Sequence, residues 1–344
     1  MTGAHAGVGR ARTVFLGSGR FAVPLLETLA ENPFVSLAAV VTAPPRPAGR
    51  RRPLRRSAVH EAAEQRGLNV MTPERLRAPE SVAAIRDLVP DLVVLADYGQ
   101  IVPSPILDLP PHGALNVHPS LLPRHRGAAP IPATILGGDR ETGVTLIRMD
   151  AGLDTGPIVA QRRIPLTGRE VAPELEQRLA EVGADLLAGN LSEWLAGRIE
   201  PRPQPPEGAT LTRPLRREHG RLDPSLGAAR LERQIRALQP WPGSFVELPT
   251  GRLIVWHAEP LALEGLPALP PGGVLPGTLL PDNGGLALAV GDGALRLGRV
   301  QPAGGRIMTA AELRRGRPAL VGSHVARGTM PEGDPERSGY SGAG

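Results

Sequence analysis

Two polar side chains that can stabilise charge and move a proton lie two positions apart in an otherwise apolar segment. Asn116 and His118 flank Val117 at the end of a run that begins at Ala114. Alternate residues of an extended segment point to the same side, so both side chains are expected to face one site. An amide N–H can donate to a developing oxyanion, and an imidazole can transfer a proton near neutral pH. The pair therefore suits acyl transfer.

A carboxylate that would complete such a site lies in the glycine-rich turn 150–156. Asp154 follows an apolar strand predicted at 143–148, and a carboxylate there can orient an imidazole and stabilise its positive charge. No serine or cysteine nucleophile is needed if the substrate's own amine attacks. A structural role for His118 is the alternative, because a single histidine near a strand end is more often structural than catalytic.

A second chemistry is indicated by the turn Gly17-Ser-Gly-Arg-Phe-Ala22. It follows an apolar run and opens a helix, as the dinucleotide-binding fingerprint G-x-G-x-x-A does. No acid follows the next strand to hold a ribose hydroxyl, although Arg46 would suit a 2′-phosphate. An NADP-dependent oxidoreductase is therefore an alternative reading.

The elements that must position these residues alternate between strands and helices, which predicts an α/β fold with a mostly parallel, doubly wound sheet. The expected strands are 13–16, 37–42, 92–96, 114–117, 143–148 and 158–164, and the expected helices are 21–32, 57–67, 81–88, 130–137 and 173–194. After a proline-rich stretch, a helix at 228–238 and short strands at 244–248, 253–257, 277–280, 286–290 and 294–299 predict a small β-barrel. The domain ranges expected from this pattern are a disordered tail 1–11, an α/β domain 12–200, a linker 201–213, a β domain 214–322 and a disordered tail 323–344.

Composition excludes several classes of chemistry. The chain has 344 residues and no cysteine, and all 39 of its basic residues are arginines. The absence of cysteine excludes disulfides, a thiolate nucleophile and cysteine-ligated metal centres, and the absence of lysine excludes a Schiff base and a P-loop lysine. No apolar run reaches the roughly 18 residues of a membrane span, and the N-terminus lacks a secretory signal. We expect a soluble, cytoplasmic, monomeric protein with no metal.

Six arginines fall within one short stretch that contains no acid. They are Arg46, Arg50, Arg51, Arg52, Arg55 and Arg56. Such a run is usually a solvated or disordered segment, and the alternative is a phosphate-binding loop.

The residues around the Asn–His pair resemble the methionyl-tRNA formyltransferase family. Residues 116–131 read NVHPSLLPRHRGAAPI, which is similar to the family signature N-x-H-x-S-L-L-P-R-W-R-G-A-A-P-I. Further similarity to family motifs continues in order through 138–145, 149–156, 234–243 and 301–305. The resemblance covers residues 12–318, both expected domains.

The resemblance implies that the chain moves the formyl group of 10-formyltetrahydrofolate to the amino group of methionyl-initiator tRNA, for translation initiation. It implies a Rossmann-like catalytic domain, an OB-like tRNA-binding domain, and Asn116, His118 and Asp154 as catalytic residues. The cofactor-binding residues it implies are Tyr98, Gly99, Gln100, Ile101, Ser120, Leu121, Leu122, Pro123 and Asp150.

Arginines rather than aromatic rings are expected to hold the RNA, because aromatic residues make up only 3% of the chain and base stacking requires exposed rings. Trp241 and Trp256 have apolar neighbours and are expected in the core. Arginine contacts to phosphate mainly position the nucleic acid. The predicted contacts are Arg46, Arg50, Arg51, Arg52, Arg213, Arg216, Arg217 and Arg306, with Arg296 and Arg299 also considered.

Some residues depart from the family pattern. Asp97 stands where the family has a small residue, His125 where it has tryptophan, and the family reads G-T-P-D-F-A at 17–22. Three alternatives stay open at this point: a folate-dependent formyltransferase acting on a small amine, a non-catalytic RNA-binding protein, and the NADP oxidoreductase.

Overall fold

The computed structural model describes residues 10–47, 53–261 and 274–325, and it divides them between two compact units. The first unit takes its described residues from 1–130, 141–165 and 174–211, and the second takes them from 131–140, 166–173 and 212–344. Two short segments of the N-terminal sequence therefore belong with the C-terminal unit.

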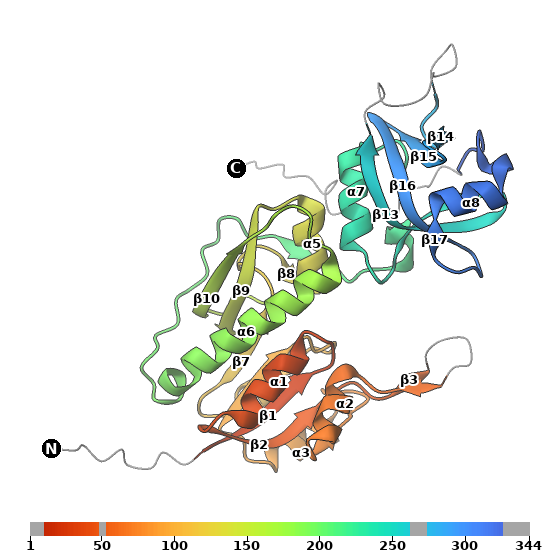
Figure 1. Ribbon diagram of the computed structural model, residues 1–344. Coiled ribbons are helices and arrows are strands. Elements are labelled where there is room, and N and C mark those ends of the chain that lie inside the picture. The colour runs from red at the N-terminus through yellow and green to blue at the C-terminus, as the bar shows by residue number, and fades with distance from the viewer. Residues whose placement is uncertain (1–9, 48–52, 262–273, 326–344) are drawn as a thin grey trace. The chain divides into compact units, whose positions relative to one another are not determined.

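A seven-stranded sheet forms the centre of the first unit (Figure 1). Its strands are β1 (Ala11–Gly17), β2 (Val35–Val41), β5 (Val70–Met71), β6 (Leu92–Ala96), β7 (Ala114–His118), β9 (Glu141–Arg148) and β10 (Ile158–Pro165). The order is β10-β9-β7-β6-β1-β2-β5, in which β7 to β5 run parallel and β9 and β10 are antiparallel to their neighbours. The predicted mostly parallel α/β sheet is thereby confirmed.

Helices cover both faces of this sheet. The face with α1 (Ala22–Glu31) and α6 (Ala172–Leu195) is tightly packed, because a Cβ on Gly183 of α6 would lie 3.0 Å from Val117 Cγ1. On the opposite face, α3 (Pro79–Arg86) and α4 (Ser104–Leu107) join one buried apolar cluster with Val93 and Leu95. Since residues alternate along β7, Asn116 and His118 lie on the α3 and α4 side of the sheet.

Shorter elements complete the first unit. The helix α2 (Ala58–Gln65) begins after Ser57, whose Oγ accepts from the His60 N–H at 2.9 Å, as the predicted N-cap requires. Two-residue strands form two further pairs: β3 (Arg46–Pro47) with β4 (Leu54–Arg55), and β8 (Arg126–Gly127) with β11 (Leu211–Thr212). Sequence periodicity predicts none of these four strands, because two residues carry no pattern.

The second unit is built on an antiparallel sheet. Its elements are α5 (Pro130–Gly137), η1 (Arg217–Gly220), α7 (Ala228–Ala237), β12 (Ser244–Leu248), β13 (Gly251–Leu261), β14 (Leu279–Asp282), β15 (Gly285–Val290), β16 (Gly293–Pro302), β17 (Met308–Thr309), α8 (Ala310–Gly316) and η3 (Pro318–Leu320). The strand order is β12-β13-β16-β15-β14, with β17 on β16. Leu231 and Ile235 of α7 pack into the same buried cluster as Val255 and Leu297. The expected C-terminal β domain is confirmed.

Two of the expected connecting segments differ from the sequence interpretation. Residues up to Leu211 of the expected linker belong to the first unit, where Arg202 exchanges backbone hydrogen bonds with Ile158 at 2.7 and 2.8 Å. In the expected C-terminal tail, His324 forms a β-bridge with Thr278, and Val325 is 1% exposed. The rest of the expected tails, 1–9 and 326–344, lies outside the described residues. Of the helices that the structure describes, none is long and apolar enough to cross a bilayer.

Candidate active site

The strand β7 brings Asn116 and His118 together as predicted. Both side chains are buried, and both belong to the strand face that α3 and α4 cover. In the parallel pairing with β6, Asn116 lies opposite Leu95, so the carboxyl ends of β1, β6 and β7 meet at one edge. His118 therefore lies at the edge where ligands gather in open α/β sheets.

Asp154 reaches this pair by a route that the sequence does not indicate. Because β9 runs antiparallel to β7, the chain leaves β9 beside Ala114, where the Met149 N–H donates to Ala114 O at 2.7 Å. The loop 150–157 must then return along β7 before Asp154 meets Asn116. Asp154 does follow a strand, as expected, and the return of the loop along β7 brings the three side chains together.

The Asp154 carboxylate is the centre of the arrangement. Its Oδ1 accepts from Asn116 Nδ2 at 3.0 Å, its Oδ2 accepts from the Gly127 N–H at 2.8 Å, and Oδ2 lies 3.6 Å from His118 Nδ1. Both the His118 and Asp154 side chains are largely buried. A buried carboxylate needs such donors, because its charge is costly to remove from water.

The other nitrogen of His118 contacts the backbone. Nε2 lies 2.9 Å from the carbonyl oxygen of His125, and a carbonyl oxygen only accepts, so this contact requires a proton on Nε2. Nδ1 is then the nitrogen that faces Asp154 Oδ2. His125 itself has a φ of 58°, in the left-handed region that histidine enters more readily than most residues.

Two polar side chains, one on β9 and one on β10, form hydrogen bonds with the backbone of the segment Ser120–Pro123. Thr145 Oγ1 donates to Ser120 O at 2.6 Å and accepts from the Leu122 N–H at 3.1 Å. Gln161 Nε2 donates to Leu122 O at 3.1 Å and to Thr145 Oγ1 at 2.8 Å. Ser120 and Leu122 are buried, whereas Leu121 and Pro123 are partly exposed, so only the latter two present side-chain surface.

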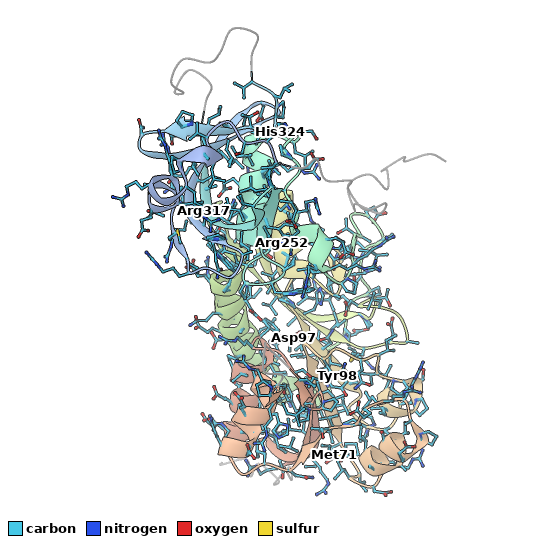
Figure 2. The ribbon with its side chains drawn as sticks, turned by 90° about the vertical axis from the view of Figure 1, so that its right-hand side faces the viewer. Met71, Asp97, Tyr98, Arg252, Arg317 and His324 are labelled. Carbon is cyan, nitrogen blue, oxygen red and sulfur yellow. The ribbon has the colours of Figure 1, made fainter. Side chains whose placement is uncertain are left out.

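The predicted segment Tyr98–Ile101 has mixed roles. Gln100 uses its side chain within the chain, accepting from the Leu76 N–H at 2.8 Å and donating to Pro73 O at 3.1 Å. Ile101 is 86% exposed. The Tyr98 hydroxyl (Figure 2) is buried without a hydrogen-bond partner among the described residues, and its burial raises the pKa of Tyr98 to about 12.

The predicted cofactor residue Asp150 lies at the start of the Asp154 loop. Its Oδ1 accepts from the Gly152 N–H at 3.0 Å and from Thr155 Oγ1 at 2.7 Å. Leu153, between the two aspartates, is 58% exposed. The loop therefore presents an acidic and an apolar side chain to solvent beside the buried Asp154.

The apparent dinucleotide fingerprint serves a different purpose. The N–H groups of Ser18 and Gly19, which a pyrophosphate would need, donate to Asp97 O at 3.0 and 3.3 Å. The Asp97 carboxyl lies against Gly19, so that a Cβ on Gly19 would overlap it. The Asp97 side chain and its carbonyl occupy the place that a pyrophosphate would need at this turn, so the structure does not support the NADP alternative.

Asp97, labelled in Figure 2, also has a shifted pKa. The residue is exposed, and desolvation of its carboxyl group, which lies against Gly19, raises its pKa. Burial, and secondly the Asp97 charge, raise the pKa of Glu176 on α6. The charge of Asp97 thus disfavours ionisation of Glu176.

The predicted tRNA-binding arginines are distributed over both units. Arg46 is exposed on β3 in the first unit, whereas Arg50, Arg51 and Arg52 lie outside the described residues. In the second unit Arg213, Arg216, Arg217 and Arg306 are all exposed. Arg306 already forms an ion pair with Glu312 at 3.0 Å, and Arg296 forms one with the buried Asp282 at 2.6 Å.

Arg299 differs from these ion-paired arginines. It is exposed, and it has no carboxylate partner among the residues that the structure describes. It lines a cavity of about 830 Å³ in the second unit, together with Arg169, Trp256, His257 and Glu259. Trp256 is only half-buried there, and Trp241 is 54% exposed, so our expectation that both rings belong to the core is wrong.

Sequence reasoning missed several groups that build the site. The Gly127 N–H and the His125 carbonyl are backbone groups, which no residue pattern reveals. Gln204 lies in the expected linker, yet its Nε2 donates to Asp154 O at 2.7 Å. No signal in the proline-rich linker distinguishes this glutamine.

We predict that Gly19 and Asp97 are energetically coupled. Gly19→Ala should lower the urea midpoint of unfolding, because the new Cβ displaces the Asp97 carboxyl, and it should cost less in an Asp97→Ala background. We expect a coupling free energy of at least about 0.5 kcal/mol. Gly99→Ala is the control, since nothing lies within 4 Å of its Cβ position. Additive effects of Gly19→Ala and Asp97→Ala would refute the coupling.

Comparisons with known proteins identify the family of this chain. The family model described as formyl transferase matches residues 11–191, and that described as formyl transferase, C-terminal domain, matches residues 214–318. A methionyl-tRNA formyltransferase of Halorhodospira halophila is 47% identical over 315 residues, which cover 92% of this chain and 99% of that protein. One of Gluconobacter oxydans is 42% identical over 315 residues, covering 91% and 99%.

Solved structures share the fold at low identity. HypX from Aquifex aeolicus in complex with tetrahydrofolic acid has a TM-score of 0.58 at 18% identity, covering 89% of this chain and 47% of HypX. An N-formyltransferase from Helicobacter canadensis, in complex with folinic acid and dTDP-3-aminofucose, has a TM-score of 0.59 at 17% identity, covering 83% and 99%. These structures support the fold alone. The two family models and the curated relatives, matched over nearly their full length, show that this chain belongs to the methionyl-tRNA formyltransferase family.

Proposed function

We propose that this chain transfers the formyl group of 10-formyltetrahydrofolate to the amino group of methionyl-initiator tRNA. The observation that carries the proposal is the Asp154 carboxylate, which binds Asn116 at 3.0 Å and faces His118 at 3.6 Å. This arrangement suits an acyl transfer in which the substrate supplies the nucleophile. We also propose that the chain acts as a monomer and, because its substrate is a tRNA, in the cytoplasm.

In the mechanism that we propose, the amide of Asn116 stabilises developing negative charge. One of its N–H groups donates to Asp154, and this bond fixes the plane of the amide, leaving the second N–H for the oxygen of the attacked formyl group. A preorganised donor of this kind costs no reorganisation when the charge develops. The Gly127 N–H also donates to Asp154 and restrains its carboxylate. The carboxylate in turn restrains the Asn116 amide.

His118 and Asp154 handle the proton. The amine loses a proton as its nitrogen bonds to the formyl carbon, and the nitrogen of the leaving tetrahydrofolate gains one as its bond to that carbon breaks. We assign this transfer to the pair of the His118 imidazole and the Asp154 carboxylate, which lie 3.6 Å apart. The positive charge that forms on the ring is then opposed by the carboxylate.

The residues around the trio fit a reduced folate. The Tyr98 hydroxyl is buried without a partner, so a polar group of a ligand would relieve a cost that the protein otherwise bears. Ile101 and Leu153 offer exposed apolar surface for a flat ring, and Asp150 offers a carboxylate that suits ring N–H groups. When bound, the folate supplies the activated formyl group. We propose Tyr98, Gly99, Ile101, Leu121, Pro123 and Asp150 as the residues that contact it, with Gln100, Ser120 and Leu122 supporting them from the chain's interior.

Exposed arginines of the second unit are proposed to hold the tRNA through its phosphates. Arg213, Arg216, Arg217 and Arg299 are exposed there, and a guanidinium donates to phosphate in a planar fork. The half-buried Trp256 in the Arg299 cavity offers an aromatic face as well. Such contacts position the RNA without reading its sequence.

One assay tests the proposed function directly. Labelled formyl groups should pass from 10-formyltetrahydrofolate to charged initiator methionyl-tRNA, and much less to charged elongator methionyl-tRNA. A sugar amine serves as the small-amine acceptor for comparison. Transfer to the sugar amine but to neither tRNA would overturn the assignment.

We predict that Asn116→Asp lowers kcat by about 10²–10³-fold. The variant removes the N–H donor and places a second carboxylate beside Asp154, so the oxyanion loses its partner. tRNA affinity, measured by filter binding, should not change. Asn283→Asp is the matched control, because Asn283 is an exposed residue of the second unit. Equal turnover of the two variants would contradict the role of Asn116.

We also predict a steep salt dependence of tRNA binding that involves Arg299. Each phosphate contact releases counterions, so Arg299→Gln should reduce the slope of log affinity against log salt by about 0.9. Arg198→Gln is the control, since Arg198 is exposed but ion-paired with Glu193 in the first unit. A slope that Arg299→Gln leaves unchanged would remove Arg299 from the interface.

A further inference from the structure

Gln204 makes an unusually complete set of contacts from within the proline-rich segment. Its Nε2 donates to Asp154 O at 2.7 Å and to Gly156 O at 2.8 Å. Its Oε1 accepts from Arg126 Nε at 3.1 Å and from Arg126 Nη2 at 2.7 Å. The residues on either side, Pro203 and Pro205, are exposed, whereas Gln204 is partly buried. Its side chain is therefore directed into the protein from an exposed backbone.

These contacts join the two segments that determine where the Asp154 carboxylate lies. The first is the backbone of the Asp154 loop, in which Asp154 has a φ of 53°, a left-handed conformation that an aspartate adopts at a cost. The second is β8, whose Gly127 N–H donates to Asp154 Oδ2 at 2.8 Å. Gln204 bonds to Asp154 itself and to Arg126, the residue before Gly127, and so fixes one segment relative to the other.

The same stretch of chain also supports His118. The Thr210 Oγ1 accepts from the His125 N–H at 2.7 Å, and Thr210 O accepts from the Arg126 N–H at 2.9 Å. His125 is the residue whose carbonyl oxygen contacts His118 Nε2. Asp154 and His118 are thus both held, through one intermediate contact each, by residues of the segment 202–212.

We propose that Gln204 is a positioning residue of the active site, which sets the Asp154 carboxylate against Asn116 and His118. The inference rests on the proposed function for its kinetic consequences. An amide suits the role because it donates to two carbonyl oxygens with one atom and accepts from a guanidinium with the other. A carboxylate of the same shape satisfies only the guanidinium and repels the two carbonyls. Gln204 touches no reacting atom, and it acts through Asp154.

The test replaces a glutamine by glutamate at one position of the segment and a glutamate by glutamine at another. Gln204→Glu keeps the shape and the Arg126 contact but removes the donors to Asp154 and Gly156. Glu207→Gln is the reciprocal control, because Glu207 is exposed on the same segment. We expect Gln204→Glu to lower kcat by about 10- to 100-fold, the effect of misplacing a catalytic group by about 1 Å. KM for both substrates should be unchanged, and Glu207→Gln should behave as the unmodified protein.

A second measurement needs no substrate. The side-chain amide of Asn116, assigned by the loss of its signal in Asn116→Asp, reports the bond to Asp154 in a ¹H–¹⁵N spectrum. Gln204→Glu should move this signal, and Glu207→Gln should not. If the unmodified protein transfers no formyl group, the proposed function fails, while the Asn116 signal still decides whether Gln204 positions Asp154.

The proposal is overturned if Gln204→Glu leaves both kcat and the Asn116 signal unchanged. It is equally overturned if the variant only lowers the melting temperature, since that result assigns Gln204 a structural role alone. Gln204→Ala, which introduces no charge, is read by the same two measurements in case the glutamate variant does not fold. Far-UV circular dichroism at the assay temperature establishes that each variant is folded.

Discussion

The site depends on one buried negative charge. The Asp154 carboxylate draws the amide of Asn116 to one oxygen and the N–H of Gly127 to the other, and it faces the imidazole of His118. Removing such a charge from water is unfavourable unless donors replace the lost hydration. The neighbouring groups are therefore not free to rotate, and the requirement that stabilises the carboxylate also orients the amide and the imidazole that the chemistry uses.

The backbone around this charge adopts conformations that the chain does not favour by itself. Asp154 and His125 both have positive φ values, 53° and 58°, and such residues persist only where surrounding contacts determine them. Gly156, which follows Asp154 closely, has no room for a Cβ because the Arg148 carbonyl lies there. Contacts from Gln204 and Thr210 offset the cost on the two sides of the site. The segment that leads toward the second unit thus contributes to the geometry of the first.

The sequence predicts the features of the site that follow from the regular periodicity of strands and helices. Asn116 and His118 share a face because strands alternate, and the buried runs at 92–96 and 114–118 mark central strands. The direction of β9 is not encoded in its own residues, so the sequence does not predict the return path to Asp154. The helix α8 is not among the predicted helices, although Thr309 and Glu312 form a capping box, a pattern that indicates the start of a helix. The position of Asp97 beside Gly19 cannot be foreseen, because no periodic pattern relates the loops that follow two different strands.

The absence of lysine has a structural consequence beyond charge. Arg126 donates from Nε and Nη2 to the single Oε1 of Gln204, and Arg252 donates from the same two atoms to Glu247 Oε1 while it stacks over the Phe245 ring at 3.7 Å. A lysine has neither the planar fork nor the flat face that these contacts require. Arginines of this kind are already hydrogen-bonded within the chain and have fewer donors left for a ligand. Arg299 is an example of an exposed arginine without a carboxylate partner among the described residues. The guanidinium of such an arginine can bind a phosphate. A count of basic residues therefore overstates the surface that binds RNA, and the pairing of each guanidinium is the better guide to where that surface lies.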